Sequence, residues 1–142
     1  MTIAAILSGK GDKLLSVECD TKVRDAVRLL AENRIGSLPV LKGGKVVGIM
    51  SERDIIYNLA RDEEKVLDWK VEQVMTAPAI TVTGDVQVLA ALSQMSKKRI
   101  RHLPVVENDR LIGIVSIGDL VAYRISKIEQ EAEAMRAYIQ SA

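Results

Sequence analysis

The sequence predicts a mixed α/β (α+β) protein built from two pseudo-twofold related β-α-β-β-α repeats that pack sheet to sheet, with a long C-terminal helix. The main evidence is an internal duplication: Asp20–Ile55 aligns without a gap with Asp85–Leu120, and 12 of the 36 aligned positions are identical. Unrelated segments would share about two or three. One copy of roughly 60 residues would bury too small a core to be comfortable alone, so we expect the copies to pack together around a cleft.

The first copy contains a helical stripe followed by two runs typical of β-strands. Val23, Ala26, Val27 and Leu30 recur at helical spacing. Two apolar runs then flank Gly43-Gly44, a dipeptide typical of a two-residue hairpin turn. The expected elements are a strand at Leu14–Val17, a helix capped by Asp20 or Thr21 and ending near Asn33, hairpin strands at Leu38–Leu41 and Val46–Met50, and a helix after Ser51 with Ile55, Leu59 and Ala60 facing inward.

The second copy repeats this order after a charged, partly helical connection around Trp69. Its hairpin turn carries Asn108-Asp109, which has the same turn chemistry as Gly-Gly. The expected elements are a strand at Ile80–Val82, a helix at Val86–Lys98 and hairpin strands at Leu103–Val106 and Leu111–Val115.

Two segments lie before the first copy. Thr2–Leu7 is apolar and is expected to form a helical turn or a docking arm. Ser8–Lys13 is polar and rich in glycine, but it lacks the spacing of a phosphate-binding P-loop, so we expect a turn.

The end of the chain breaks the symmetry between the copies. A helical pattern runs from Ser116 to about Ile139, with apolar residues at steps of 4, 3, 4, 3 and 4. This is short for a coiled coil, so the helix is expected either to fold back on its own domain or to pack against a second chain. We divide the chain into repeat 1 (7–61), a connecting segment (62–73), repeat 2 (74–123) and a helical extension (124–142).

Composition excludes several classes of function. The chain of 142 residues is 48% apolar and 27% charged, and its net charge of +1 gives no broad electrostatic attraction to nucleic acid or to a membrane. No apolar run approaches a membrane span, and the N-terminus lacks the features of a signal peptide. Cys19 is the only cysteine, so a reducing cytoplasm is the expected location. No metal-ligand cluster or nucleophile motif is present, and we expect no enzyme activity.

Both copies place Ser-x-x-Asp between a strand and a helix, at Ser51–Asp54 and Ser116–Asp119. This pattern is close to a capping box, in which the serine oxygen accepts a hydrogen bond from a free helix N–H. The same helix N-terminus can receive an anion, and its aspartate can accept hydrogen bonds from a ribose diol. The residues alone leave both interpretations open.

These features together resemble a tandem pair of cystathionine β-synthase (CBS) domains, often called a Bateman module. The resemblance extends from about Leu7 to Tyr123 and depends on the hydrophobic-Pro-Val strand, the hairpin and the Gly-h-h-Ser-x-x-Asp motif of each copy. It implies that an adenosine-containing ligand, such as AMP, ADP, ATP, NAD(H) or S-adenosylmethionine, binds between the repeats as a regulatory ligand. It also implies a homodimer of CBS pairs and an unidentified regulated protein. No partner domain is attached, so a stand-alone module is expected.

The resemblance implies two ligand sites, each made from both copies. Asp119 and Asp54 would bind ribose hydroxyls, and isoleucines would contact the base. By position, the first site would contain Ser16, Glu18, Ile35, Gly36, Ser37, Arg101, His102, Ile114, Ser116, Gly118 and Asp119. The second would contain Thr81, Thr83, Ile100, Arg101, His102, Gly36, Ser37, Ile49, Ser51, Arg53 and Asp54.

Arg101-His102 is where the two copies diverge most, because the first copy has Gly36-Ser37 at the same positions. Arginine suits bidentate phosphate contact, and His102 would add charge if its pKa rose beside a phosphate. Arg53 and Arg99 are further phosphate candidates. This asymmetry predicts unequal sites, and the site containing both Arg101 and Asp119 is favoured.

The sequence therefore supports a non-catalytic sensor that binds an adenosine ligand and transmits its presence to a partner protein. The alternative is a ligand-independent interaction or scaffold protein that acts through the C-terminal helix. Nucleic-acid binding through the basic cluster at Lys97–Arg101 is a weaker third possibility, because aromatic stacking partners are missing.

Overall fold

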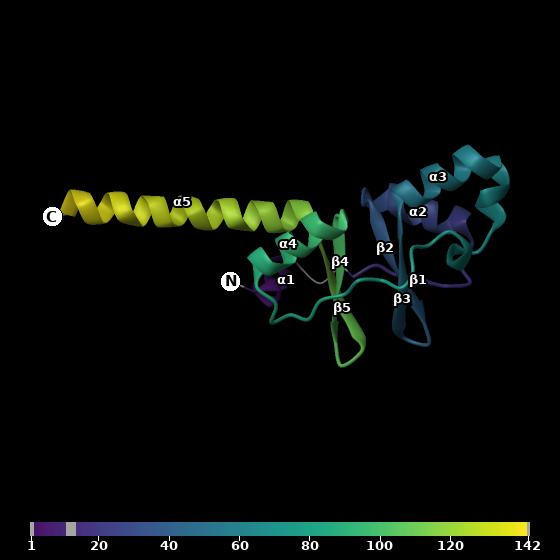
Figure 1. The fold of residues 1–142 in the computed structure, drawn as a ribbon, viewed down its shortest axis with the longest axis horizontal. Coiled ribbons are helices and arrows are strands. Elements are labelled where there is room, and N and C mark those ends of the chain that lie inside the picture. Colours follow the sequence, from purple (N-terminus) through teal and green to yellow (C-terminus); the bar gives the residue numbers. More distant parts are fainter. Residues whose placement is uncertain (1, 11–13, 142) are drawn as a thin grey trace.

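The computed structural model describes residues 2–10 and 14–141, and it confirms the mixed α/β class with two related repeats. The repeats lie side by side with their hairpins facing one another, and α5 extends away from them (Figure 1). The first part contains α1 (Ile3–Lys10), β1 (Val17–Glu18), α2 (Val23–Asn33), β2 (Ser37–Lys42), β3 (Lys45–Ser51) and α3 (Glu52–Asp62). The rest contains the 3₁₀ turns η1 (Glu63–Asp68) and η2 (Val71–Gln73), then α4 (Val88–Lys98), β4 (His102–Glu107), β5 (Arg110–Ser116) and α5 (Ile117–Ser141).

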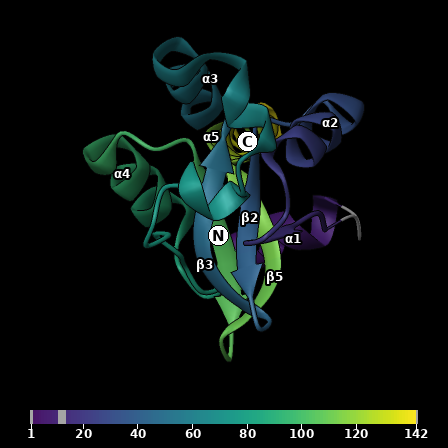
Figure 2. The ribbon, with the colours of Figure 1, turned by 90° about the vertical axis from the view of Figure 1, so that its right-hand side faces the viewer.

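The two hairpins have the same register and the same turn geometry. Ser37 pairs with Ser51 at the open end of one hairpin, and His102 pairs with Ser116 in the other. Both turn residues have positive φ in each hairpin, at Gly43-Gly44 and at Asn108-Asp109, as a type I′ turn requires. The predicted hairpins are thus confirmed, and β3 contacts β5 between the repeats (Figure 2).

Several local expectations are wrong because tertiary partners replace local signals. The N-cap of α2 is Lys22 and makes no side-chain capping bond, so neither Asp20 nor Thr21 caps this helix. The first helical N–H, on Val23, instead lies beside the Trp69 carbonyl and donates to it at 2.8 Å. Of the expected strand at Ile80–Val82, only Val82 forms a bridge, and Ala60 on α3 is exposed.

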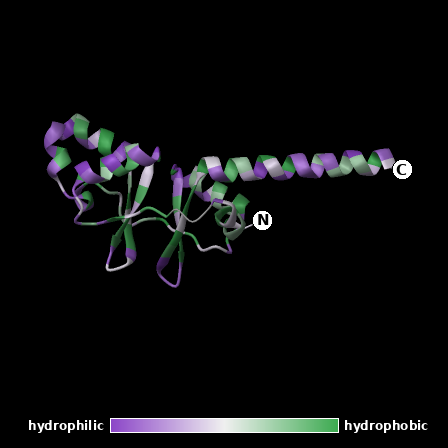
Figure 3. Ribbon diagram, turned by 180° about the vertical axis from the view of Figure 1, so that it is seen from behind, coloured by the Kyte–Doolittle hydropathy of each residue, from purple (hydrophilic) through white to green (hydrophobic). Residues whose placement is uncertain are grey.

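The segment that leads into each repeat packs on the other repeat. Ile3 and Ile6 of α1 are buried in the core of the second repeat, next to β5 and α5. Val71 and Val74, in the segment that leads into the second repeat, are buried in the core of the first. The apolar strands that form these cores are visible in Figure 3. This exchange joins the repeats into one unit, and it makes the apolar N-terminal segment a docked helix rather than a loose turn.

Glycines in β3 and β5 allow the exchanged segments to approach. A Cβ on Gly113 would lie 2.5 Å from Cδ2 of Leu7 in α1. A Cβ on Gly48 would lie 2.6 Å from Sδ of Met75 and 2.8 Å from the Thr76 carbonyl oxygen. All three distances are too short for a real contact, so the glycines of the duplicated motif are needed for close packing.

Helix α5 does not fold back over its own domain. Its first turns pack on the second repeat, but every described residue from Ile128 onward is exposed. The helix therefore projects into solvent for much of its length (Figure 1).

We expect alanine at either glycine to lower the free energy of unfolding by about 1–3 kcal/mol, because added methyl groups overpack a filled core. Leu7→Ala should partly rescue Gly113→Ala, since it removes the clashing side chain, but it should not rescue Gly48→Ala. Urea denaturation of the single and double variants measures this coupling. Strictly additive effects of Leu7→Ala and Gly113→Ala would contradict the close approach.

Candidate functional site

Both Ser-x-x-Asp motifs form capping boxes, as the first interpretation predicts. The Ser51 hydroxyl accepts from the Asp54 N–H at 3.3 Å, and Asp54 Oδ2 accepts from the Ser51 N–H at 2.9 Å. In the second repeat the corresponding distances are 3.1 Å and 2.8 Å. Each aspartate is therefore fixed at the start of α3 or α5, where it lines a cavity.

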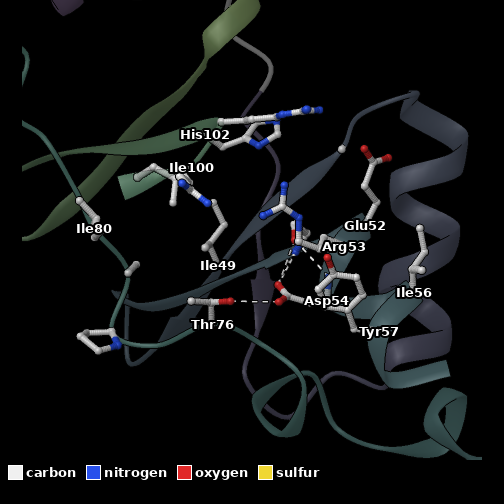
Figure 4. A pocket seen from close by; sticks show the side chains of 16 residues that line it. Ile49, Glu52, Arg53, Asp54, Ile56, Tyr57, Thr76, Ile80, Ile100 and His102 are labelled. Carbon is white, nitrogen blue, oxygen red and sulfur yellow. Dashed lines mark hydrogen bonds between the residues drawn. The ribbon is translucent and has the colours of Figure 1, made fainter. Parts of the chain in front are cut away.

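The cavity beside Asp54, which we call the Asp54 pocket, has a volume of about 400 Å³. Figure 4 shows Ile80 and Ile100 on one side of it, Ile49 between, and Asp54 with Arg53 on the other side. Thr76 donates its hydroxyl hydrogen bond to Asp54 Oδ1 at 3.0 Å. The remaining lining residues are Gly36, Ser51, Glu52, Ile56, Tyr57, Pro78, Ala79, Arg99, Arg101 and His102.

The cavity beside Asp119, the Asp119 pocket, has a volume of about 370 Å³. Lys10, at the end of α1, donates from Nζ to Asp119 Oδ2 at 2.7 Å and to the Ile114 carbonyl at 2.8 Å. The hydroxyl of Ser37 is buried in the lining and has no hydrogen-bond partner within the described chain. The other lining residues are Leu15, Asn33, Arg34, Ile35, Gly36, His102 and Ser116.

The volumes of both pockets fall within the range of small-molecule sites, about 300–1,000 Å³. Gly36 and His102 line both pockets, so the two cavities meet at these residues. Across this junction, His102 Cε1 lies 3.6 Å from where a Cβ of Gly36 would be.

The Asp119 pocket brings together much of the first predicted site. It contains seven of the residues expected there and lacks Ser16, Glu18, Arg101 and Gly118. Leu15, one position before Ser16, lines the pocket in its place. The residues that the structure does gather here are Ile35, Gly36, Ser37, His102, Ile114, Ser116 and Asp119.

The Asp54 pocket brings together much of the second predicted site. Thr81, Thr83 and Ser37 are not in its lining, and Ile80 takes the position next to Thr81. The Thr83 hydroxyl instead donates to the Asp85 carboxylate. The expected residues that do line it are Gly36, Ile49, Ser51, Arg53, Asp54, Ile100, Arg101 and His102.

The favoured combination of Arg101 with Asp119 does not occur in one pocket. Arg101 lines the Asp54 pocket only, because it precedes β4 on the side of the junction that faces α3. Arginines therefore gather unequally: Arg53, Arg99 and Arg101 line the Asp54 pocket, whereas Arg34 is the arginine in the Asp119 lining.

Sequence reasoning missed the lining residues that come from the exchanged segments. Lys10 lies in the segment that leads into the first repeat but meets Asp119 of the second. Thr76 lies in the segment that leads into the second repeat but meets Asp54 of the first, and no local pattern marks either residue. Arg34 could have been found from the sequence, because it aligns with Arg99 in the duplication. In the structure both residues have left-handed φ at a helix end. The other unexpected lining residues are Leu15, Asn33, Glu52, Ile56, Tyr57, Pro78, Ala79 and Ile80.

Electrostatics differ between the pockets. Burial lowers the pKa of His102, and the carboxylates of Glu52 and Asp119 oppose this only in part, so its imidazole is neutral at pH 7. Burial by itself raises the pKa of Asp119, but hydrogen bonds from Lys10 and from the Ser116 backbone bring it below its usual value. Asp119 is thus an ion-paired carboxylate, while Asp54 bonds a neutral hydroxyl.

We expect Lys10→Met to raise the pKa of Asp119, because the ammonium group that stabilises its charged form is gone. A lowered folded-state pKa contributes stability above the ordinary aspartate pKa of about 3.9, and this contribution is lost as pH falls through the folded-state value. The variant should therefore differ from the parent most at neutral pH and least in acid. NMR titration of the Asp119 carboxyl carbon in the parent and in the variant tests this. An unchanged Asp119 pKa would refute the ion pair.

Among residues 2–10 and 14–141, no group of three or more histidine, cysteine, aspartate or glutamate side chains is arranged to hold a metal ion. Within the same residues, none of the helices combines the length and apolar character needed to span a bilayer.

Two repeats that exchange their leading segments, each presenting a capped aspartate to a pocket at their junction, define a tandem-repeat module with two pockets. The chain belongs to the CBS domain family, whose family model matches residues 11–61 and 71–126. The resemblance found in the sequence is therefore confirmed.

Relatives share both sequence and structure with this chain. It is 34% identical to the mitochondrial CBS domain-containing protein CBSX3 of Arabidopsis thaliana, over 98% of this chain and 72% of the relative. A protein with CBS domains from Burkholderia ambifaria has a TM-score of 0.83 and 36% identity, covering 89% of this chain and 95% of that one. The chain spans only 33% of a 37% identical Thermofilum pendens relative.

Some of the similar structures contain ligands. The CBS domain pair of protein MJ0100, solved in complex with 5′-methylthioadenosine and S-adenosyl-L-methionine, has a TM-score of 0.79 and 28% identity, covering 89% of this chain and 98% of that one. Both compounds contain adenosine.

Proposed function

We propose that this CBS pair is a non-catalytic regulatory module that binds an adenosine nucleotide (AMP, ADP, ATP or NAD(H)) in the Asp54 pocket and transmits its presence to a partner protein. The observation that carries the proposal is the composition of this pocket. It combines a capped carboxylate, an apolar region of isoleucines and a set of arginines in about 400 Å³. The adenosine compounds bound by the CBS pair of MJ0100 support the same ligand class.

Each part of the nucleotide has a chemical counterpart in the pocket. The Asp54 carboxylate would accept hydrogen bonds from the ribose hydroxyls beside Thr76, which already donates to it. Ile49, Ile80 and Ile100 offer apolar contact for the base. Arg53, Arg99 and Arg101 would bind phosphate, since guanidinium groups form bidentate contacts with phosphate oxygens.

The Asp119 pocket is the weaker candidate because Lys10 already binds its carboxylate at 2.7 Å. The Lys10 ammonium offsets the negative charge that Asp119 offers to a ribose, because it donates a charge-assisted hydrogen bond to Oδ2. The two pockets meet at Gly36 and His102, so a ligand in one can alter the other. Transmission to a partner requires that the ligand bind one arrangement of the repeats more tightly than another.

Isothermal titration with AMP, ATP, NAD, NADH and S-adenosylmethionine tests the proposal. We expect Asp54→Asn to weaken binding of the best ligand about 10- to 100-fold, since hydrogen bonds to a charged group are lost. Asp119→Asn is the matched control, because it disturbs the equivalent capping box and leaves the Asp54 pocket intact. No heat with any ligand at millimolar concentration, or an equal loss in both variants, would refute the assignment.

A second experiment tests the phosphate contact. Arg101→Ala should weaken AMP binding about tenfold or more but leave adenosine binding nearly unchanged, because only AMP carries the group that the guanidinium would bind. Arg34→Ala, on the other pocket, is the matched control. An equal effect of Arg101→Ala on both ligands would show that Arg101 acts on the shape of the pocket and not on phosphate.

A further inference from the structure

The exposed part of α5 carries an apolar stripe that nothing in the described chain covers. Along it, Ile125 is 51% exposed, Met135 59% and Ile139 65%. Large apolar side chains in a continuous row on a surface mark an interaction site more often than isolated ones do. The full stripe consists of Val121, Ile125, Ile128, Ala132, Met135 and Ile139.

The parent domain covers a different face of the helix. Leu120 is fully buried, and Tyr123 packs against the core of the second repeat. Lys127 lies over the Tyr123 ring, with its Nζ 5.7 Å from the ring centroid. Successive residues turn about 100° around a helix. Val121, where the stripe begins, therefore lies about 100° around the helix axis from the buried Leu120. The domain therefore cannot bury the stripe without detaching α5.

We propose that a second copy of this chain covers the stripe, with the two α5 helices parallel and in register. The steps of 3 and 4 place Ile125, Ala132 and Ile139 at the a positions of a heptad repeat, and Val121, Ile128 and Met135 at the d positions. This assignment is independent of what occupies the pockets.

The charges beside the stripe favour this arrangement. In a parallel pair, each g residue faces the e residue five positions later in the other copy. Arg124 then faces Glu129 of the second copy, and Glu131 faces its Arg136. Both pairs join opposite charges, and symmetry repeats each of them. Arg136 contacts Glu133 of its own helix at 3.3 Å, but this exposed pair is weak enough to exchange.

The antiparallel arrangement that overlaps the whole stripe brings like charges together. In that register e faces e and g faces g, so Glu129 would face Glu129 and Glu131 would face Glu131 of the second copy. Like charges at such positions disfavour a pairing and so specify its orientation.

The pairing is expected to be reversible. From Val121 to Ile139 the helix rises only about 27 Å, less than a long coiled coil offers. Ala132 also contributes little apolar surface at the centre of the stripe. We therefore expect a monomer–dimer equilibrium that depends on protein concentration.

Sedimentation velocity of the full chain without ligand, over a range from about 1 to 500 μM, tests the proposal. We expect a dimer at high concentration that Ile128→Asp abolishes. Gln130→Asp is the matched control, because it adds the same charge on the opposite face of the same helix turn and should leave the dimer intact. A monomer at every concentration, a trimer, or a dimer unaffected by Ile128→Asp would overturn the proposal.

Charge reversal tests the orientation. Glu129→Arg places Arg124 opposite an arginine and should weaken the dimer about tenfold, because attractive pairs become repulsive. The double variant Arg124→Glu with Glu129→Arg restores opposite charges and should recover the parent affinity. These residues are five apart, so they do not face each other within one helix, and rescue requires a second copy. A double variant no better than the single one would overturn the parallel arrangement.

Discussion

The arrangement of this molecule depends on the exchange of leading segments between the two repeats. Ile3 and Ile6 complete the core of the second repeat, while Val71 and Val74 complete that of the first. The close approach is possible because β5 and β3 carry glycine where the segments cross, at Gly113 and Gly48. Without this exchange each repeat would lose part of its core, and a unit of such size has little core to lose.

The same exchange makes the two pockets chemically different. Each crossing segment ends beside the capped aspartate of the repeat that it covers. The segment before the second repeat brings the Thr76 hydroxyl to Asp54, and the N-terminal segment brings the Lys10 ammonium to Asp119. A neutral hydroxyl leaves Asp54 its negative charge for a ligand, whereas the ammonium neutralises Asp119. The sequence predicts unequal sites from Arg101-His102 against Gly36-Ser37, and the leading segments add a second difference between them.

Under the proposed function, the Ser-x-x-Asp motif of the first repeat would serve helix capping and ligand binding with the same carboxylate. One carboxylate oxygen of Asp54 caps α3 through the Ser51 N–H, and the other bonds Thr76 at the cavity. A cap holds the side chain in one orientation before a ligand arrives, so less side-chain entropy is lost on binding. The structural and functional interpretations of the motif are therefore compatible. The carboxylate has enough oxygen lone pairs for both roles.

The sequence by itself determined the features that depend on local patterns. The duplication, the hairpins with their Gly43-Gly44 and Asn108-Asp109 turns, the capping boxes and the long C-terminal helix follow from spacing and turn chemistry. Gly36, His102 and four of the pocket isoleucines also followed, from the family resemblance; these isoleucines are Ile35, Ile49, Ile100 and Ile114.

Only the tertiary structure decided which distant segments meet. The start of α2 is bonded to the Trp69 carbonyl and not to a local cap, and Arg101 lies with Asp54 and not with Asp119. Lys10 meets Asp119 across more than a hundred residues of chain. Such contacts depend on how the two repeats pack, and packing depends on shape and burial summed over many residues. Periodicity along one segment carries information about its own buried face but not about the segment that will cover it.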